Sequence, residues 1–228
     1  PPPIARQVKR QTGHRIGMVN VNDIILPSYE DYVAKTKVLK SETEKFTTTP
    51  NQANLESLRT AWKNAYLSFQ KVGMFDFGKA YEIQLKEFSN IYPTNVTGIE
   101  SNISSGTYNL TLISQMDKQG FPALDYLLFG LGDTDDTVLE FYTINASANS
   151  YKKYLTDVSN RLNSLSEQVL NSWKSGYKQN YISSTGNSVT SSVNITVNAF
   201  VKYYEKDVRS GKVGIPAGIF STEKLPNK

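Results

Sequence analysis

The stretch LTDVSNRLNSLSEQVLNSW, from Leu155 to Trp173, decides the fold class. Its large apolar residues recur at steps of three and four, with mostly polar residues between them. This spacing places the apolar side chains on one face of a helix, where they can pack against a core. We expect one long amphipathic helix over residues 137–181, long enough to brace the whole fold. The residues of its apolar face are Leu155, Val158, Leu162, Leu165, Val169 and Trp173.

The same helical spacing extends toward the N-terminus. Apolar residues recur at steps of three and four from Ile25 to Phe46, and again from Leu55 to Val72. Shorter helices are expected over 79–89, 99–106 and 108–118. The sequence therefore predicts an all-α protein, a helical bundle of about six or seven helices with short loops and one long bracing helix.

The segment over 188–201 fits two patterns. Its β-branched residues nearly alternate with polar ones, which would suit a strand. A helical spacing from Val189 through Phe200 to Asp207 fits as well, and the helix-forming residues after Val201 extend it. We interpret the segment as a helix, because a single strand in a helical protein has nothing to pair with.

The composition is that of a folded chain, and it removes several classes of chemistry. Of the 228 residues, 39% are hydrophobic and 11% aromatic, which is enough to bury a core. The sequence contains no cysteine, so disulfides, cysteine nucleophiles and thiolate metal sites are excluded. His14 is the single histidine, which rules out a histidine-rich metal site. No apolar run approaches the ~20 residues that a membrane span needs.

Residues 1–20 are interpreted as a basic leader without an assignable fold, followed by a helical domain over 21–228. The local positive charge of the leader comes from Arg6, Lys9, Arg10 and Arg15. No aromatic platform accompanies these residues, so we interpret the leader as solvated and expect no nucleic-acid partner.

A loop at Gly132-Asp-Thr-Asp-Asp136 brings three carboxylates together. Oxygen ligands of this kind bind hard cations, but the glutamate that closes a calcium loop is missing from the expected position. We therefore expect Asp135 and Asp136 to cap the next helix instead.

The segment GFPALDYLLFG, from Gly120 to Gly130, combines a proline and an acid three residues apart with a run of large apolar side chains. Gly120 is suited to end the preceding helix, and Pro122 to begin the next one. Asp125 then falls in the first turn, where a carboxylate interacts favourably with the exposed N–H groups and the helix dipole.

Around this segment the sequence resembles the imelysin-like family. That family carries a GxHxxE motif followed by an aromatic residue, two leucines, another aromatic residue and glycine, and KQGFPALDYLLFG over 118–130 is similar to it. Three flanking pieces fit in the right order: IILPSY over 24–29, the helix over 55–70, and FDFG over 75–78. The resemblance runs from about Val21 to Gly218.

Two departures from the family pattern affect the site. Pro122 stands where the family has histidine, and Asp125 where it has glutamate. Proline offers no metal ligand, and aspartate keeps the charge on a side chain one methylene shorter. Family members are also usually longer, with a further helical bundle, and the proposed family site lies where the two parts meet. The chain looks like the N-terminal part of that architecture.

The resemblance implies an exported bacterial protein of the periplasm, the outer membrane or the cell surface, connected with iron or nutrient uptake. A lipid anchor outside this sequence would bring it to a membrane surface. The implied ligand-binding residues are Gly120, Phe121, Pro122, Asp125 and Tyr126. Asp125 is the implied metal ligand among them, with iron or another divalent metal as the implied cofactor.

Three functions follow from this comparison. The first is a non-enzymatic protein that binds a metal or a small ligand. The second is a metallopeptidase of the M75 type, which needs a metal-bound hydroxide and a base. Pro122 leaves its ligand set one imidazole short, which argues against an enzyme. The third is a structural or interaction module without a ligand.

Overall fold

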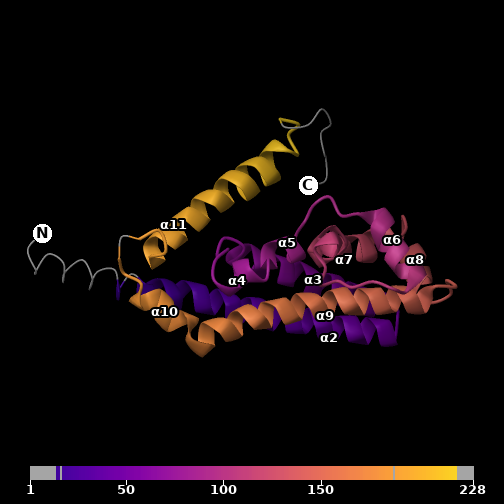
Figure 1. Cartoon of the computed structure of the whole chain (residues 1–228). Coiled ribbons are helices and arrows are strands. Elements are labelled where there is room, and N and C mark those ends of the chain that lie inside the picture. The colour runs from indigo at the N-terminus through magenta and orange to yellow at the C-terminus, as the bar shows by residue number, and fades with distance from the viewer. Residues whose placement is uncertain (1–13, 16, 187, 220–228) are drawn as a thin grey trace, which may run out of the picture.

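The computed structural model of the chain describes residues 14, 15, 17–186 and 188–219, and it confirms the all-α bundle (Figure 1). Helices and turns account for this part of the chain, and no strand occurs in it. The three long helices are α2 (Leu26–Thr48), α3 (Gln52–Val72) and α9 (Ala148–Ser172). Helix α2 packs against both of the others, and Figure 1 shows α9 running alongside it for most of its length.

The predicted core faces of these helices are confirmed. The predicted face is buried from Leu155 on α9 to Trp173, the residue after α9, and each of its six side chains is at most 2% exposed. On α2 the buried set follows the predicted spacing from Tyr29 to Phe46. Removing a large apolar side chain from water contributes about 1.5–3 kcal/mol each, so these faces supply much of the driving force for the bundle.

Small polar residues line the contact between α2 and α9. The hydroxyl of Thr36 lies 2.9 Å from that of Ser166, and the hydroxyl of Thr43 donates to Ser159 over 3.1 Å. All four side chains are buried. Their short side chains let the two helices approach closely, and the hydrogen bonds between them satisfy polar groups that would otherwise be costly to bury.

The chain between α3 and α9 folds into short helices. Figure 1 shows them as a layer above α2 and α9. Their bounds are α4 (Lys79–Glu82), α5 (Leu85–Ser89), α6 (Val96–Ser105), the 3-10 helix η2 (Ile113–Lys118), α7 (Gly120–Asp125), the π-helix η3 (Tyr126–Gly130) and α8 (Asp135–Tyr142). The expected helix over 79–89 is thus two short helices, because Gln84 takes a left-handed conformation with φ of +52° between them.

The single helix expected over 137–181 is wrong at both ends. Helix α8 stops at Tyr142 and α9 begins at Ala148. In the turn between them, the side chain of Asn145 accepts the backbone N–H of Ser147 over 2.8 Å, which is a local alternative to helical hydrogen bonding. At the other end, Gly176 has φ of 143° and interrupts the helix within η4 (Trp173–Tyr177).

The helix expected over 108–118 is also wrong in its first half. Only η2 is helical there. Before it, the side chain of Asn109 accepts hydrogen bonds from the backbone N–H and the hydroxyl of Thr111, at 3.0 and 2.7 Å. This turn folds the backbone away from a helix.

The chain leaves the bundle after α10 (Lys178–Ser183), whose Tyr181 and Ile182 are still buried in the core. The C-terminal elements after it are α11 (Ser192–Lys202) and the π-helix η5 (Tyr203–Gly214). At the other end of the chain, a short π-helix η1 (Asn20–Ile25) leads directly into α2. Helix α11 confirms the helical interpretation for residues 192–201, whereas 188–191 form a turn before it, and Figure 1 shows α11 projecting at an angle from the other helices. Lys202 ties it back to Asp76, and Asp207 of η5 pairs with Lys86, both over 3.1 Å.

None of the helices in the described ranges is long and apolar enough to cross a membrane. The predicted basic leader falls largely on residues 1–13 and 16, which lie outside the described residues.

Candidate functional site

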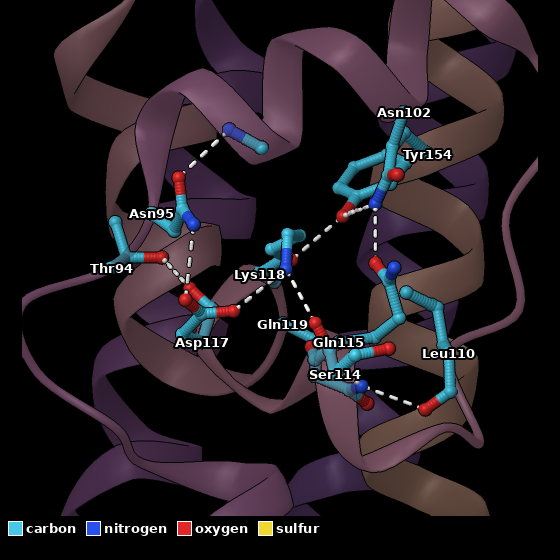
Figure 2. Close-up of polar contacts among 11 residues, drawn as sticks. Thr94, Asn95, Asn102, Leu110, Ser114, Gln115, Asp117, Lys118, Gln119 and Tyr154 are labelled. Carbon is cyan, nitrogen blue, oxygen red and sulfur yellow. Dashed lines mark hydrogen bonds and ion pairs between the residues drawn. The ribbon is translucent and has the colours of Figure 1, made fainter.

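A polar network holds residues 117–119 in place, directly before the motif segment (Gly120–Gly130) (Figure 2). The hydroxyl of Thr94 donates to the backbone carbonyl of Asp117 over 2.8 Å. The carboxylate of Asp117 accepts from Asn95 Nδ2 at 3.0 Å and from Lys118 Nζ at 2.9 Å. Partial burial raises the pKa of Asp117, but the hydrogen bonds from Lys118 and Asn95 outweigh it and hold that pKa below its usual range.

The same network ties the entering chain to α9 and α6. The hydroxyl of Tyr154 donates to the carbonyl of Lys118 over 2.7 Å and accepts from Asn102 Nδ2 at 3.1 Å. Gln119 donates through Nε2 to the carbonyl of Leu110 over 2.7 Å (Figure 2). These bonds reach α9, α6 and the loop at Leu110, so three separate segments hold the residues at which the motif segment begins.

Gly120 begins α7 and does not end a helix, contrary to the prediction. It is buried with φ of +80°, and the residue before it is extended. A Cβ at this position would lie within 2.5 Å of the carbonyl carbon of Ser89, at the end of α5. Only glycine combines this backbone conformation with so close an approach. The motif glycine is therefore required for packing in this chain.

Phe121 anchors the motif segment in the core. Its ring stacks on Tyr66 with centroids 4.7 Å apart and contacts Phe69 at 5.5 Å. Its carbonyl accepts a hydrogen bond from Nε1 of Trp62 over 3.1 Å. The side chain is fully buried. Of the predicted ligand-binding residues, Gly120 and Phe121 are thus both buried in the folded chain.

Pro122 and Asp125 occupy the motif positions of histidine and glutamate. Pro122 is the third residue of α7, which begins at Gly120, so the prediction that Pro122 begins this helix is wrong. Asp125 is the last residue of α7 and lies beyond the first turn, so the prediction that it favours the helix start is wrong. Its side chain is exposed and has no hydrogen bond or ion pair with any residue that the structure describes. Desolvation by neighbouring groups nevertheless raises the pKa of Asp125.

Tyr66 is one of the groups near Asp125. Burial raises the pKa of the Tyr66 phenol, a hydrogen bond with Asn90 partly offsets this, and the charge of Asp125 adds to the increase. Asp125 is therefore a carboxylate at the surface whose ionised form lacks a stabilising partner in the described chain.

Tyr126 faces a different acid. Its hydroxyl donates to Oε1 of Glu100 over 2.7 Å, and the hydroxyl of Tyr151 donates to Oε2 over 2.6 Å. Burial, together with the hydrogen bond to Glu100 and its charge, raises the pKa of both phenols, so both remain protonated donors at neutral pH. Glu100 thereby ties η3 to α6 and α9.

Arg59 holds the end of the motif segment. Its Nε and Nη2 donate to the carbonyl of Leu128 at 3.0 and 2.7 Å, and its Nη1 pairs with Asp135 at 2.7 Å. Its guanidinium also lies 4.5 Å from the centroid of the Phe129 ring. One side chain of α3 therefore joins η3 to the start of α8.

Arg59, Glu100 and Tyr151 were not identified from the sequence. Arg59 lies one turn before Trp62 on α3, so the two residues share a helix face. A charged residue beside a tryptophan on that face could have indicated a polar contact with the motif segment. Glu100 and Tyr151 meet Tyr126 only through the tertiary fold, and no spacing in the sequence indicates it.

The carboxylate loop does not form a cation site in the structure. No group of three or more His, Cys, Asp or Glu residues suited to a metal occurs among the residues that are described. Helix α8 is capped by Thr134 through a capping box with Thr137, and Asp135 and Asp136 lie in the first turn rather than at the cap. A metal held by several protein ligands does not fit these residues, at the loop or around Asp125.

The fold and the motif segment together define the class: an all-α bundle in which the motif glycine begins a short buried helix. The chain belongs to the imelysin family: the sequence model of that family, described as Imelysin (peptidase M75), matches residues 25–228. No curated protein matches the sequence.

Two solved structures share the fold. An imelysin-like protein from Psychrobacter arcticum 273-4 is 18% identical with a TM-score of 0.71, covering 93% of this chain and 65% of its own. A proposed iron-regulated protein A precursor from Parabacteroides distasonis ATCC 8503 is 20% identical with a TM-score of 0.68, covering 86% of this chain and 56% of its own. The chain thus spans less than two thirds of the length of either neighbour.

Proposed function

We propose that this protein is an exported bacterial member of the imelysin family that acts without catalysis in iron or nutrient uptake, by binding a ligand at Asp125. The observation that carries the proposal is the contrast within the motif segment. Its glycine, its aromatic residues and its leucines are packed or hydrogen-bonded, whereas Asp125 is exposed and has no partner in the described part of the chain.

The state of Asp125 suits ligand binding. Neighbouring groups desolvate its carboxylate and raise its pKa, so the ionised form is less stable than in water. A cation or a hydrogen-bond donor brought by a ligand would relieve that penalty. A single carboxylate does not chelate a bare ion, so a metal complex that brings its own ligands, or a metal-free small molecule, fits this position better.

The role in uptake rests on the family and on one neighbour. The structure from Parabacteroides distasonis is that of a proposed iron-regulated protein and is called a precursor. These words concern that protein. Transferred to this chain, they support a connection with iron and a leader removed during export. Periplasmic or surface location, with a lipid anchor outside this sequence, completes the proposal.

The peptidase alternative lacks its chemistry in the described residues. Pro122 supplies no imidazole, and the described carboxylates and His14 form no metal-binding group. Chelator-sensitive cleavage of a peptide library by the full-length protein would revive this alternative.

Calorimetric titration of the full-length protein with ferric citrate, haem and calcium tests the proposal. We expect saturable binding of at least one probe, lost in Asp125→Ala. Asp133→Ala is the matched control, because Asp133 is also an exposed acid without a partner in the described chain. Binding that survives in Asp125→Ala contradicts the proposed site. No binding of any probe by the wild type favours the module without a ligand.

A further inference from the structure

A second polar site lies away from the motif segment, in an open groove of about 360 Å³ on α9. Its volume is within the range of small-molecule sites. The groove is lined by Tyr108, Asn109 and Leu110 of the loop after α6, and by Lys153, Asp157, Asn160, Arg161 and Ser164 of α9. No residue of the motif segment lines it, so its chemistry can be tested separately from that of Asp125.

The one acid of the groove is already neutralised. Lys153 Nζ and the hydroxyl of Tyr108 both donate to Oδ2 of Asp157, at 2.5 and 2.7 Å. The Lys153 ammonium also lies 4.8 Å from the centroid of the Tyr108 ring. Burial and the hydrogen bond to Asp157 raise the pKa of Tyr108 to about 12, so the phenol remains a donor at neutral pH.

Arg161 has no counter-ion in the described chain. It lies one turn beyond Asp157, where opposite charges commonly pair along a helix, but Asp157 is bonded to Lys153 and Tyr108 instead. The Arg161 guanidinium lies 5.0 Å from the centroid of the Phe88 ring and is half-buried. Two cations and one acid leave the groove with one unbalanced positive charge.

Two enclosed polar atoms at the groove also lack partners within the described residues. They are Nε of Arg161, a donor, and Oδ1 of Asn160, an acceptor. Buried polar atoms in folded proteins are nearly always hydrogen-bonded. Burial also lowers the pKa of Arg161, as expected for a guanidinium that is partly removed from water.

We propose that this groove binds a small organic monocarboxylate, with Arg161 as the residue that receives the carboxylate. A guanidinium offers parallel donors that match the two oxygens of a carboxylate. The ring of Tyr108 and the side chain of Leu110 provide an apolar wall, which favours an organic anion over inorganic phosphate. Asp157 disfavours a second negative charge on the ligand.

Titration with benzoate, followed by calorimetry on the full chain, tests the assignment. We expect saturable binding that Arg161→Gln weakens at least about tenfold, since the variant loses a charge-assisted hydrogen bond to the carboxylate. Arg161→Lys should restore part of the affinity, because it keeps the charge without the planar fork. Inorganic phosphate should not displace benzoate. The matched control is Arg209→Gln, which removes an exposed arginine that pairs with Glu205 on η5.

Unfolding midpoints measured with and without benzoate separate a binding role from a structural one. Benzoate should raise the midpoint of the wild type and of Arg209→Gln, but not that of Arg161→Gln. Absence of saturable binding to the wild type would overturn the proposal. So would equal affinity for benzoate in the wild type and Arg161→Gln, particularly if that variant is also less stable, since Arg161 would then serve packing alone.

Discussion

Gly120 and Ser89 are in such close backbone contact that any side chain on Gly120 would overlap the end of α5. A Cβ would lie within 2.5 Å of the Ser89 carbonyl carbon and 2.9 Å from the carbonyl oxygen of Phe88. Backbone atoms at the end of a buried helix cannot move aside as a flexible side chain can. The start of the motif segment is thus fixed by contact between two short helices.

Gly120→Ala should therefore destabilise the fold strongly. The variant combines a left-handed backbone with a steric overlap, and we expect a loss on the order of 3 kcal/mol in the free energy of unfolding. The control is Gly106→Ala, at φ of +65° with nothing within 4 Å of the new methyl group. Its loss should be about 1 kcal/mol. Urea unfolding of both variants measures the difference, and equal losses would contradict the packing argument.

Arg59→Lys should loosen the end of the motif segment. A lysine ammonium can replace the charge but not the two bonds to the Leu128 carbonyl together with the pair to Asp135. We expect a loss of about 1–2 kcal/mol in unfolding free energy. Arg209→Lys, in an exposed pair on η5, should change it by less than about 0.5 kcal/mol. A larger effect at Arg209 would count against this interpretation.

Tyrosines with raised pKa values predict a loss of stability at alkaline pH. Burial is the first cause of the raised pKa of Tyr108 and of Tyr154, to about 12 in each case. A raised pKa in the folded state means that this stability is present below the unfolded value near 10 and is lost as the pH rises toward 12. Phenolate absorbance should therefore appear together with unfolding. A full tyrosine titration below pH 10 in the folded protein would contradict it.

Glu100→Gln tests the same phenols from the acid side. Glu100 raises the pKa of Tyr126 and Tyr151 after burial does, because its charge opposes phenolate formation. The neutral amide should lower both values relative to the wild type while removing two charge-assisted hydrogen bonds. We expect a loss of about 2 kcal/mol at neutral pH. Spectrophotometric titration and urea unfolding measure the two effects separately.

The sequence predicted the long helices because the apolar residues of each helix lie on one face. The apolar face from Leu155 on α9 to Trp173 just after it is buried, as the spacing of its residues predicted. The ends were harder to place, because side chains decided them locally. Asn145 and Asn109 each bond the backbone two residues further on and start turns where the apolar spacing still allowed a helix.

The site was predictable only where its residues are consecutive in sequence. The segment around Pro122 and Asp125 was found from the motif pattern. Glu100 and Arg59 reach that segment from α6 and α3, and such contacts depend on how the helices pack. The packing also reversed two local predictions, since Gly120 begins a helix instead of ending one and Asp125 lies outside the first turn.

Asp117 and Asp125 should respond to acid in opposite directions. The pKa of Asp117 is lowered in the fold, so its contribution is present above the unfolded pKa near 3.9 and is lost as the pH falls through the lower folded value. The pKa of Asp125 is raised by desolvation, so its penalty is present at neutral pH and disappears as the pH falls through the folded value.

Asp117→Asn should cost about 1 kcal/mol or less at pH 7, after allowance for solvent screening, and the difference from the wild type should shrink in acid. Asp125→Asn should leave stability at pH 7 equal or slightly higher, with any gain vanishing in acid. Urea unfolding of both variants from pH 3 to pH 7 measures these slopes, and slopes of the same sign would show that Asp125 has a stabilising partner after all.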